Sequence, residues 1–104
     1  MLFPVIQRAP GFVLAALVVL LVTSCAREPA TAADCRALLD RIVAIELAEQ
    51  GFRDPVLTQR KQDSFARSLA DELARCEGLT VPPGARECVA QASSSEQLSH
   101  TCLR

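Results

Sequence analysis

The stretch DCRALLDRIVAIELAE, residues 34–49, decides the fold class, because its apolar residues recur at the spacing of one helix face. The residues on that face are Cys35, Leu38, Leu39, Ile42 and Ile45, with Val43 and Leu47 widening it. The polar residues expected on the water side are Asp40, Arg41, Glu46 and Glu49. Either Thr31 or Asp34 could cap the start of this helix, and Gly51 ends it.

A second helical segment begins at Asp54-Pro55, since proline is favoured in the first turn of a helix. It ends near Glu77-Gly78, because glycine is typical of a helix C-terminus. The residues on its apolar face are Phe65, Leu69, Leu73 and Cys76. We therefore expect this segment to pack against the first helix as an antiparallel hairpin.

The C-terminal part of the chain predicts a shorter helical hairpin. Residues 79–84 form a loop and residues 85–92 a helix, and a turn from Ser93 then leads to Ser95, which caps a brief last helix. The apolar positions of the two helices are Ala85, Cys88, Val89 and Ala92, and then Leu98 and Cys102. No segment alternates with period two, so the sequence predicts no strand.

The first 25 residues have the layout of a secretory signal. Arg8 is the only charged residue before Arg27, and an apolar run covers residues 11–22. The run is shorter than the ~20 residues of a usual spanning helix, although the uncharged segment 9–26 comes close to that length. An uncleaved single-span anchor therefore stays open as an alternative.

The end of this run, Val22-Thr23-Ser24-Cys25, resembles the lipobox of bacterial lipoproteins. The resemblance implies that residues 1–24 are a signal peptide and that the Cys25 thiol receives a diacylglycerol. It also implies that the new amino group at Cys25 is acylated, which gives enough acyl chains for stable anchoring. Ala26 follows Cys25 where an aspartate would retain the protein in the inner membrane, so the resemblance favours the outer membrane.

The four remaining cysteines, Cys35, Cys76, Cys88 and Cys102, all fall on the apolar faces of the expected helices. An exported protein meets oxidising conditions, so we expect two disulfides. An antiparallel arrangement slightly favours Cys35–Cys76 with Cys88–Cys102. The pairing Cys35–Cys102 with Cys76–Cys88 stays open, because all four cysteines should gather at one end of the bundle.

The expected fold is all-α: a small disulfide-stapled helical bundle of two longer amphipathic helices plus a short C-terminal helical hairpin. With 104 residues the chain holds at most one domain. We place that domain at 34–104, after a lipid-anchored flexible tether at 25–33 that lacks large apolar residues. Eleven basic and twelve acidic residues give a net charge of −1, which argues against nucleic acid as a partner.

The order of cysteines, helices and loops over residues 35–102 is similar to that of small four-cysteine helical lipoproteins of unknown function from GC-rich Gram-negative bacteria. That resemblance implies no catalytic residue and no cofactor. The spacing of the cysteines also lacks the close ligand pairs of structural zinc sites. His100 and Cys102, with Cys76 and Cys88, are nevertheless the residues to examine for a metal.

Catalytic chemistry finds little support in the sequence. Ser93–Ser95 lie near His100, but a polar turn offers neither a buried base nor an oxyanion site. Asp71 and Glu72 are adjacent on a helix, so they point in different directions. Thioredoxin-type redox chemistry needs a Cys-x-x-Cys pair, and the chain has none.

Two surface features are candidates for contacts with partners. Arg60 and Lys61 could touch anionic lipid head groups, although two charges are a weak signal. Arg53, Val56 and Leu57 could form a partly apolar lip at the far end of the helical hairpin. The sequence therefore predicts a periplasm-facing, lipid-anchored envelope protein that is not an enzyme, with a protein partner possible. A thiol-based metal or ligand carrier is the alternative.

Overall fold

The computed structural model describes residues 28–103, and within them the expected all-α fold class, a small helical bundle with two disulfides, is confirmed. The helices are α2 (Ala32–Glu49), α3 (Pro55–Ser68), α4 (Ala70–Cys76), α5 (Ala85–Gln91), α6 (Ser95–Gln97) and the π-helical turn η1 (Leu98–Cys102). The strands are β1 (Glu28–Pro29) and β2 (Thr80–Val81). The expected signal peptide and Cys25 lie outside the described residues.

The central helix, α2, begins two residues earlier than predicted, because Thr31 is its cap. The Thr31 hydroxyl oxygen accepts a hydrogen bond from the backbone N–H of Asp34 at 3.1 Å. The Asp34 carboxylate accepts one in return from the Thr31 N–H at 2.9 Å. This reciprocal capping box satisfies two backbone donors that a helix start leaves unpaired.

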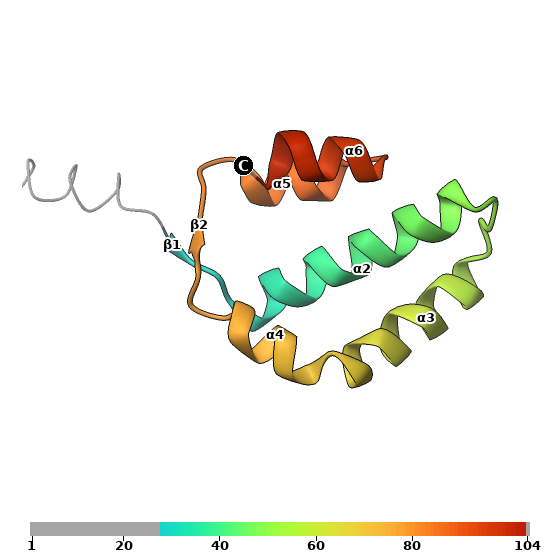
Figure 1. Cartoon of the computed structure of the whole chain (residues 1–104), viewed down its shortest axis with the longest axis horizontal. Coiled ribbons are helices and arrows are strands. Elements are labelled where there is room, and N and C mark those ends of the chain that lie inside the picture. The colour runs from blue at the N-terminus through green and yellow to red at the C-terminus, as the bar shows by residue number, and fades with distance from the viewer. Residues whose placement is uncertain (1–27, 104) are drawn as a thin grey trace, which may run out of the picture.

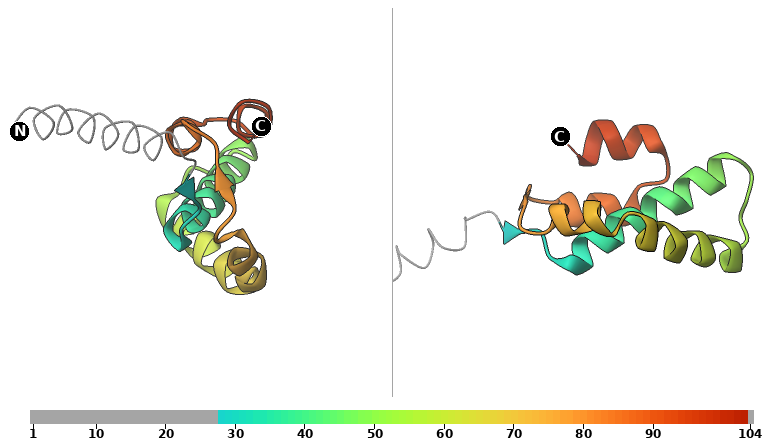
Figure 2. Two further views of the ribbon diagram at one scale, coloured as in Figure 1. Left: turned by 90° about the vertical axis from the view of Figure 1, so that its left-hand side faces the viewer. Right: turned by 60° about the horizontal axis from the view of Figure 1, so that its bottom comes forward.

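Two groups of helices flank α2, as Figures 1 and 2 show. The helices α3 and α4 lie on one side of it, and α5, α6 and η1 lie on the other. The buried residues of the main core cluster are Ile45, Ala92, Leu98 and Cys102, with Leu38, Ile42, Cys88 and Val89 packed against them. The core therefore lies between α2 and the C-terminal hairpin, as the predicted apolar faces of those segments require.

The second predicted helix is interrupted at Leu69, whose backbone angles (φ −106°, ψ 28°) leave the helical region. Figure 1 shows α4 departing from the line of α3 and turning toward the start of α2. The change of direction brings Cys76, at the end of α4, against Cys35. No feature of the sequence indicates this change, because Leu69 fits the apolar pattern without a break.

The contact between α2 and α3 is more polar than predicted. Arg36 donates hydrogen bonds to Asp40 at 2.8 Å and to Asp63 of α3 at 2.7 Å, and Gln62 donates to the Asp40 carbonyl at 2.9 Å. Asp40 is therefore a half-buried partner and not a water-facing residue. Polar groups fill part of this interface. Phe65, which was expected on the buried face of its helix, is instead 46% exposed and lies outside the core.

The other corrections lie at the start of the domain. The structure has a short antiparallel ribbon, with Glu28 opposite Val81 and Pro29 opposite Thr80, where the sequence predicted no strand. The Ala30 N–H donates to the Leu79 carbonyl at 2.6 Å, and the Gly78 N–H donates to the Ala30 carbonyl at 2.9 Å. Residues 28–33 are therefore part of the folded domain and not of a flexible tether.

The C-terminal hairpin turns as predicted, but Ser94 and not Ser95 caps α6. The Ser94 hydroxyl oxygen accepts a hydrogen bond from the Gln97 N–H at 3.1 Å. The Ser95 hydroxyl and N–H instead both donate to the Glu49 carboxylate at the end of α2, at 2.6 and 2.7 Å. On the same side, the Arg41 guanidinium donates to the Ala90 carbonyl at 2.6 Å, so Arg41 is not a free water-facing charge either.

Candidate functional site

The structure contains the disulfide pairing that the sequence slightly favoured. Cys35–Cys76 joins the start of α2 to the end of α4, with 6.0 Å between the Cα atoms. Cys88–Cys102 joins α5 to η1, with 5.4 Å between the Cα atoms. Every cysteine of the described residues is therefore half of a disulfide, so none of them is a thiolate ligand or nucleophile in this oxidised state.

The suggested metal ligands do not form a cluster. His100 is exposed, whereas Cys102, two residues on, is buried and bonded to Cys88. Within residues 28–103, no group of three histidine, cysteine or acidic side chains is placed to hold a metal ion. The same part of the chain has no helix of the length and apolar character needed to cross a bilayer.

The residues considered for catalysis have structural partners. Ser94 caps α6 and Ser95 binds Glu49, while the Ser93 hydroxyl and N–H both donate to the Gln97 side-chain oxygen at 3.3 and 3.1 Å. The hydrogen bonds from Ser95 lower the pKa of Glu49, because they stabilise its ionised form. These groups hold helix ends together, and their geometry does not present a nucleophile.

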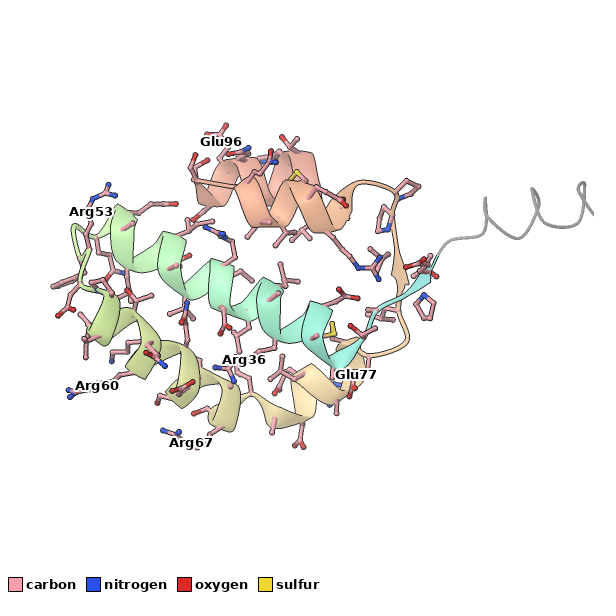
Figure 3. The ribbon with its side chains drawn as sticks, turned by 180° about the vertical axis from the view of Figure 1, so that it is seen from behind. Arg36, Arg53, Arg60, Arg67, Glu77 and Glu96 are labelled. Atoms are coloured by element: carbon pink, nitrogen blue, oxygen red, sulfur yellow. A yellow bond between two sulfur atoms is a disulfide. The ribbon has the colours of Figure 1, made fainter. Side chains whose placement is uncertain are left out.

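Surface charges on α3 and α4 face water. Figure 3 shows Arg36 directed from α2 toward α3, whereas Arg60 and Arg67 point away from the body of the domain. Arg60 and Lys61 are both exposed, as the lipid head-group hypothesis requires. Glu72 pairs with Arg75 at 3.2 Å and does not form a carboxylate pair with Asp71.

The predicted lip at the far end of the helical hairpin is partly apolar. Val56 is 59% exposed, Leu57 is half-buried and Arg53 is exposed. Phe52, which the sequence analysis did not single out, adds an apolar side chain that is 51% exposed. These side chains lie at the turn between α2 and α3, away from both disulfides.

The strongest electrostatic feature is one that the sequence analysis missed. Arg86, in the first turn of α5, donates two hydrogen bonds to the Asp34 carboxylate, both at 2.8 Å. A third hydrogen bond, of 3.0 Å, runs from Arg86 to Glu28 of β1. One guanidinium thus joins α5, the start of α2 and the ribbon, in the fork geometry that only arginine provides.

The pKa values of this pair follow from the contacts. The Arg86 guanidinium, together with the Thr31 N–H, holds the pKa of Asp34 well below its usual range. The Asp34 carboxylate in turn raises the pKa of Arg86. Both groups therefore stay charged and paired at any ordinary pH. Because 52 residues separate them in sequence, no local pattern could have indicated the pair.

Beside this pair lies a cavity of about 390 Å³, which we call the ribbon groove. Its walls come from the start of α2, from β2 and its flanks, from α5 and from the last turn of the chain. Its apolar lining includes Ala37, Leu79, Val81 and Leu103. Its volume is in the range of ~300–1,000 Å³ that is typical of ligand sites.

A second cavity, of about 450 Å³, lies between α2 and α3, and we call it the hairpin groove. Its apolar walls include Leu39, Ile42 and Phe65, with Lys61 and Glu46 among the lining residues. The exposed Phe65 and the charged Lys61 therefore line the same groove, although the sequence analysis places them in two unrelated features. The domain thus carries one apolar groove on each side of α2.

Comparison with known proteins identifies no relative of this chain. Protein-family models, curated proteins and solved structures all give no match to the chain. The functional reading therefore rests on the residues and the geometry described above.

Proposed function

We propose that this chain is a lipid-anchored cell-envelope protein whose folded domain is a non-enzymatic interaction or accessory module. The observation that carries the proposal is the lipobox-like Val22-Thr23-Ser24-Cys25, which ends three residues before Glu28, the first residue that the structure describes. Removal of residues 1–24 would leave an acylated Cys25 directly ahead of the ribbon. The domain would then face the periplasm, with the outer membrane favoured over the inner one.

The oxidised cysteines support export. Two disulfides in a domain of this size fit an oxidising compartment, where small domains use such bonds to compensate for a limited core. Among the described residues, every buried side chain is apolar. Such a domain has stability to gain from covalent bonds and little buried polar machinery for chemistry.

The non-enzymatic part of the proposal rests on what the polar residues do. The serines of the C-terminal turn cap a helix or bind neighbouring side chains, and Arg86 and Asp34 satisfy each other. The surfaces left for a role are apolar: the two grooves and the lip around Phe52 and Val56. Exposed apolar patches of this kind are typical of contact surfaces.

Intact mass of the protein recovered from membranes tests the proposal. We expect loss of residues 1–24, an added acyl mass on Cys25, and four thiols that react with an alkylating reagent only after reduction. The control is a Cys25→Ser variant, which should keep its full length and carry no lipid.

Two other results would contradict parts of the proposal. A full-length unlipidated mass for the unchanged protein would make the segment 9–26 a membrane anchor in place of the acyl chains. Four thiols that react before reduction would instead favour the thiol-based metal or ligand carrier, because the cysteines would then be free to bind.

A further inference from the structure

The ribbon groove selects for an uncharged, apolar occupant. Its charged lining residues, Asp34 and Arg86, are bound to each other at 2.8 Å, so neither offers an unpaired charge to a ligand. The rest of its lining is almost entirely apolar, with the Thr80 hydroxyl as a small polar exception. A polar ligand placed here would lose its water and gain few hydrogen bonds in return.

The apolar surface continues out of the groove. Leu79, next to β2, is 61% exposed, and Leu103, at the last turn, is 48% exposed. Both leucines line the groove, so they extend its walls into a rim. A rim of exposed leucine around an apolar hollow favours a partner that covers both together.

The position of the groove in the chain indicates what covers it. Val81 lines the groove and is paired with Glu28, the first residue that the structure describes. Cys25 lies three residues before Glu28, and three residues span at most roughly 10 Å. Figure 1 shows the ribbon and the end of the chain at the same end of the domain, opposite the turn between α2 and α3. If Cys25 is acylated, this end lies at the membrane surface.

We propose that the ribbon groove binds one acyl chain of a bilayer lipid, with Leu79 and Leu103 resting in the interfacial layer. This inference rests on the proposed function, because the lipid anchor at Cys25 is what brings the groove to the bilayer. A lipid chain that moves from the bilayer into the groove stays out of water throughout. The transfer also removes water from the groove and from the two leucines, which is its driving force.

The test uses the fact that the chain contains no tryptophan. The lipidated Leu79→Trp variant, which begins at Cys25, is purified from membranes and reconstituted into phosphatidylcholine vesicles, with or without bromine atoms on the acyl chains. We expect the Leu79→Trp emission to shift to shorter wavelength and to lose most of its intensity in the brominated vesicles, because bromine quenches on contact.

The matched control is Phe52→Trp. Phe52 is similarly exposed, at 51%, but it follows the far end of α2, which extends about 17 Å beyond Leu38, the last residue of that helix to line the groove. Its emission should be the same in both kinds of vesicle. Equal quenching at both positions would overturn the inference, because the domain would then lie on the membrane without preference for the groove.

A second variant separates occupation of the groove from contact of its rim. Ala37 is exposed on α2 and lines the groove, so Ala37→Glu places a carboxylate on the groove wall without disturbing the core. Combined with Leu79→Trp, it should reduce the quenching while the far-ultraviolet circular dichroism stays unchanged. Unreduced quenching would mean that only the rim touches lipid, and the acyl site would be refuted.

The remaining outcomes distinguish this inference from the anchor itself. Protein that floats with the vesicles but shows unquenched Leu79→Trp emission keeps its anchor and refutes the groove. A blue-shifted but unquenched emission would mean that another apolar group, such as an acyl chain of Cys25, fills the groove, which also refutes the inference. Protein that carries no acyl mass and does not float refutes the anchor and the inference together.

Discussion

Removal of the Cys35–Cys76 disulfide should destabilise the domain both globally and at α4. The bond closes a loop with a sequence separation of 41 residues. In the chain-entropy description, a closed loop of that length restricts the unfolded state by about 4 kcal/mol. Small domains have total stabilities at the lower end of roughly 5–15 kcal/mol. The variant with Cys35→Ala and Cys76→Ala should therefore be close to its unfolding midpoint in water.

The local effect follows from the position of α4. This helix has seven residues, none of them buried, and no side-chain cap at its start. Isolated helices of that length do not persist in water. The disulfide at Cys76 is the covalent link that holds α4 against α2, so its amides should be the first to lose protection from hydrogen exchange.

Urea unfolding followed by circular dichroism, together with amide hydrogen exchange, measures both effects on the chain beginning at Ala26. The matched control replaces Cys88 and Cys102 by alanine. The Cys88–Cys102 disulfide closes a loop with a sequence separation of 14 residues, so its removal should lower the free energy of unfolding by about 3 kcal/mol. The amides of α4 should keep their protection relative to those of the other helices. A Cys35→Ala, Cys76→Ala variant with unchanged midpoint and unchanged exchange in α4 would refute the reasoning.

Three further predictions concern the helix cap, acid stability and the core. Thr31→Ala should lower the free energy of unfolding by about 1 kcal/mol, because it removes the cap of α2, and urea titration measures this. The pKa values of Asp34 and Glu49 are lower in the folded chain than in the unfolded one. The contribution of these two carboxylates to the free energy of unfolding should therefore be constant at pH values above their pKa values in the unfolded chain, about 4. It should be lost as the pH falls further, which a series of urea titrations at decreasing pH would show. Ile45→Ala should cost roughly 2–5 kcal/mol, since Ile45 is buried in the core, whereas exposed Glu46→Ala should change stability by less than about 0.5 kcal/mol. Similar losses at both positions in thermal unfolding would contradict the assignment of the core.

The helices could be predicted because their signals are local. The apolar spacing of residues 34–49 and the Asp54-Pro55 start each lie within a few turns of the segment they define. The favoured disulfide pairing followed from the same helices, since an antiparallel hairpin brings the start of α2 to the end of α4. The break at Leu69 escaped prediction, because a leucine in an unbroken apolar pattern gives no sign of a change in backbone direction.

The features that build the candidate site could not be predicted, because they join distant segments. A two-residue strand is too short to show alternation, so the pairing of Glu28 with Val81 left no mark in the sequence. The ribbon groove has walls from several elements, and none of them is distinctive alone. The lipobox is the opposite case: it is a short local motif, so the sequence suggests the anchor although Cys25 lies outside the described residues.

The ribbon also determines how the domain responds to tension that enters from its N-terminal side. A pull of that kind acts first on the ribbon's few backbone hydrogen bonds and on the contact between Arg86 and Glu28. When these give way, residues 28–31 leave β2, and as a fully extended segment they span at most about 14 Å. Extension then stops at Cys35, because its bond to Cys76 passes the load to the covalent frame. The start of the domain is thus a short extensible spacer with a fixed limit, and the core beyond it stays folded.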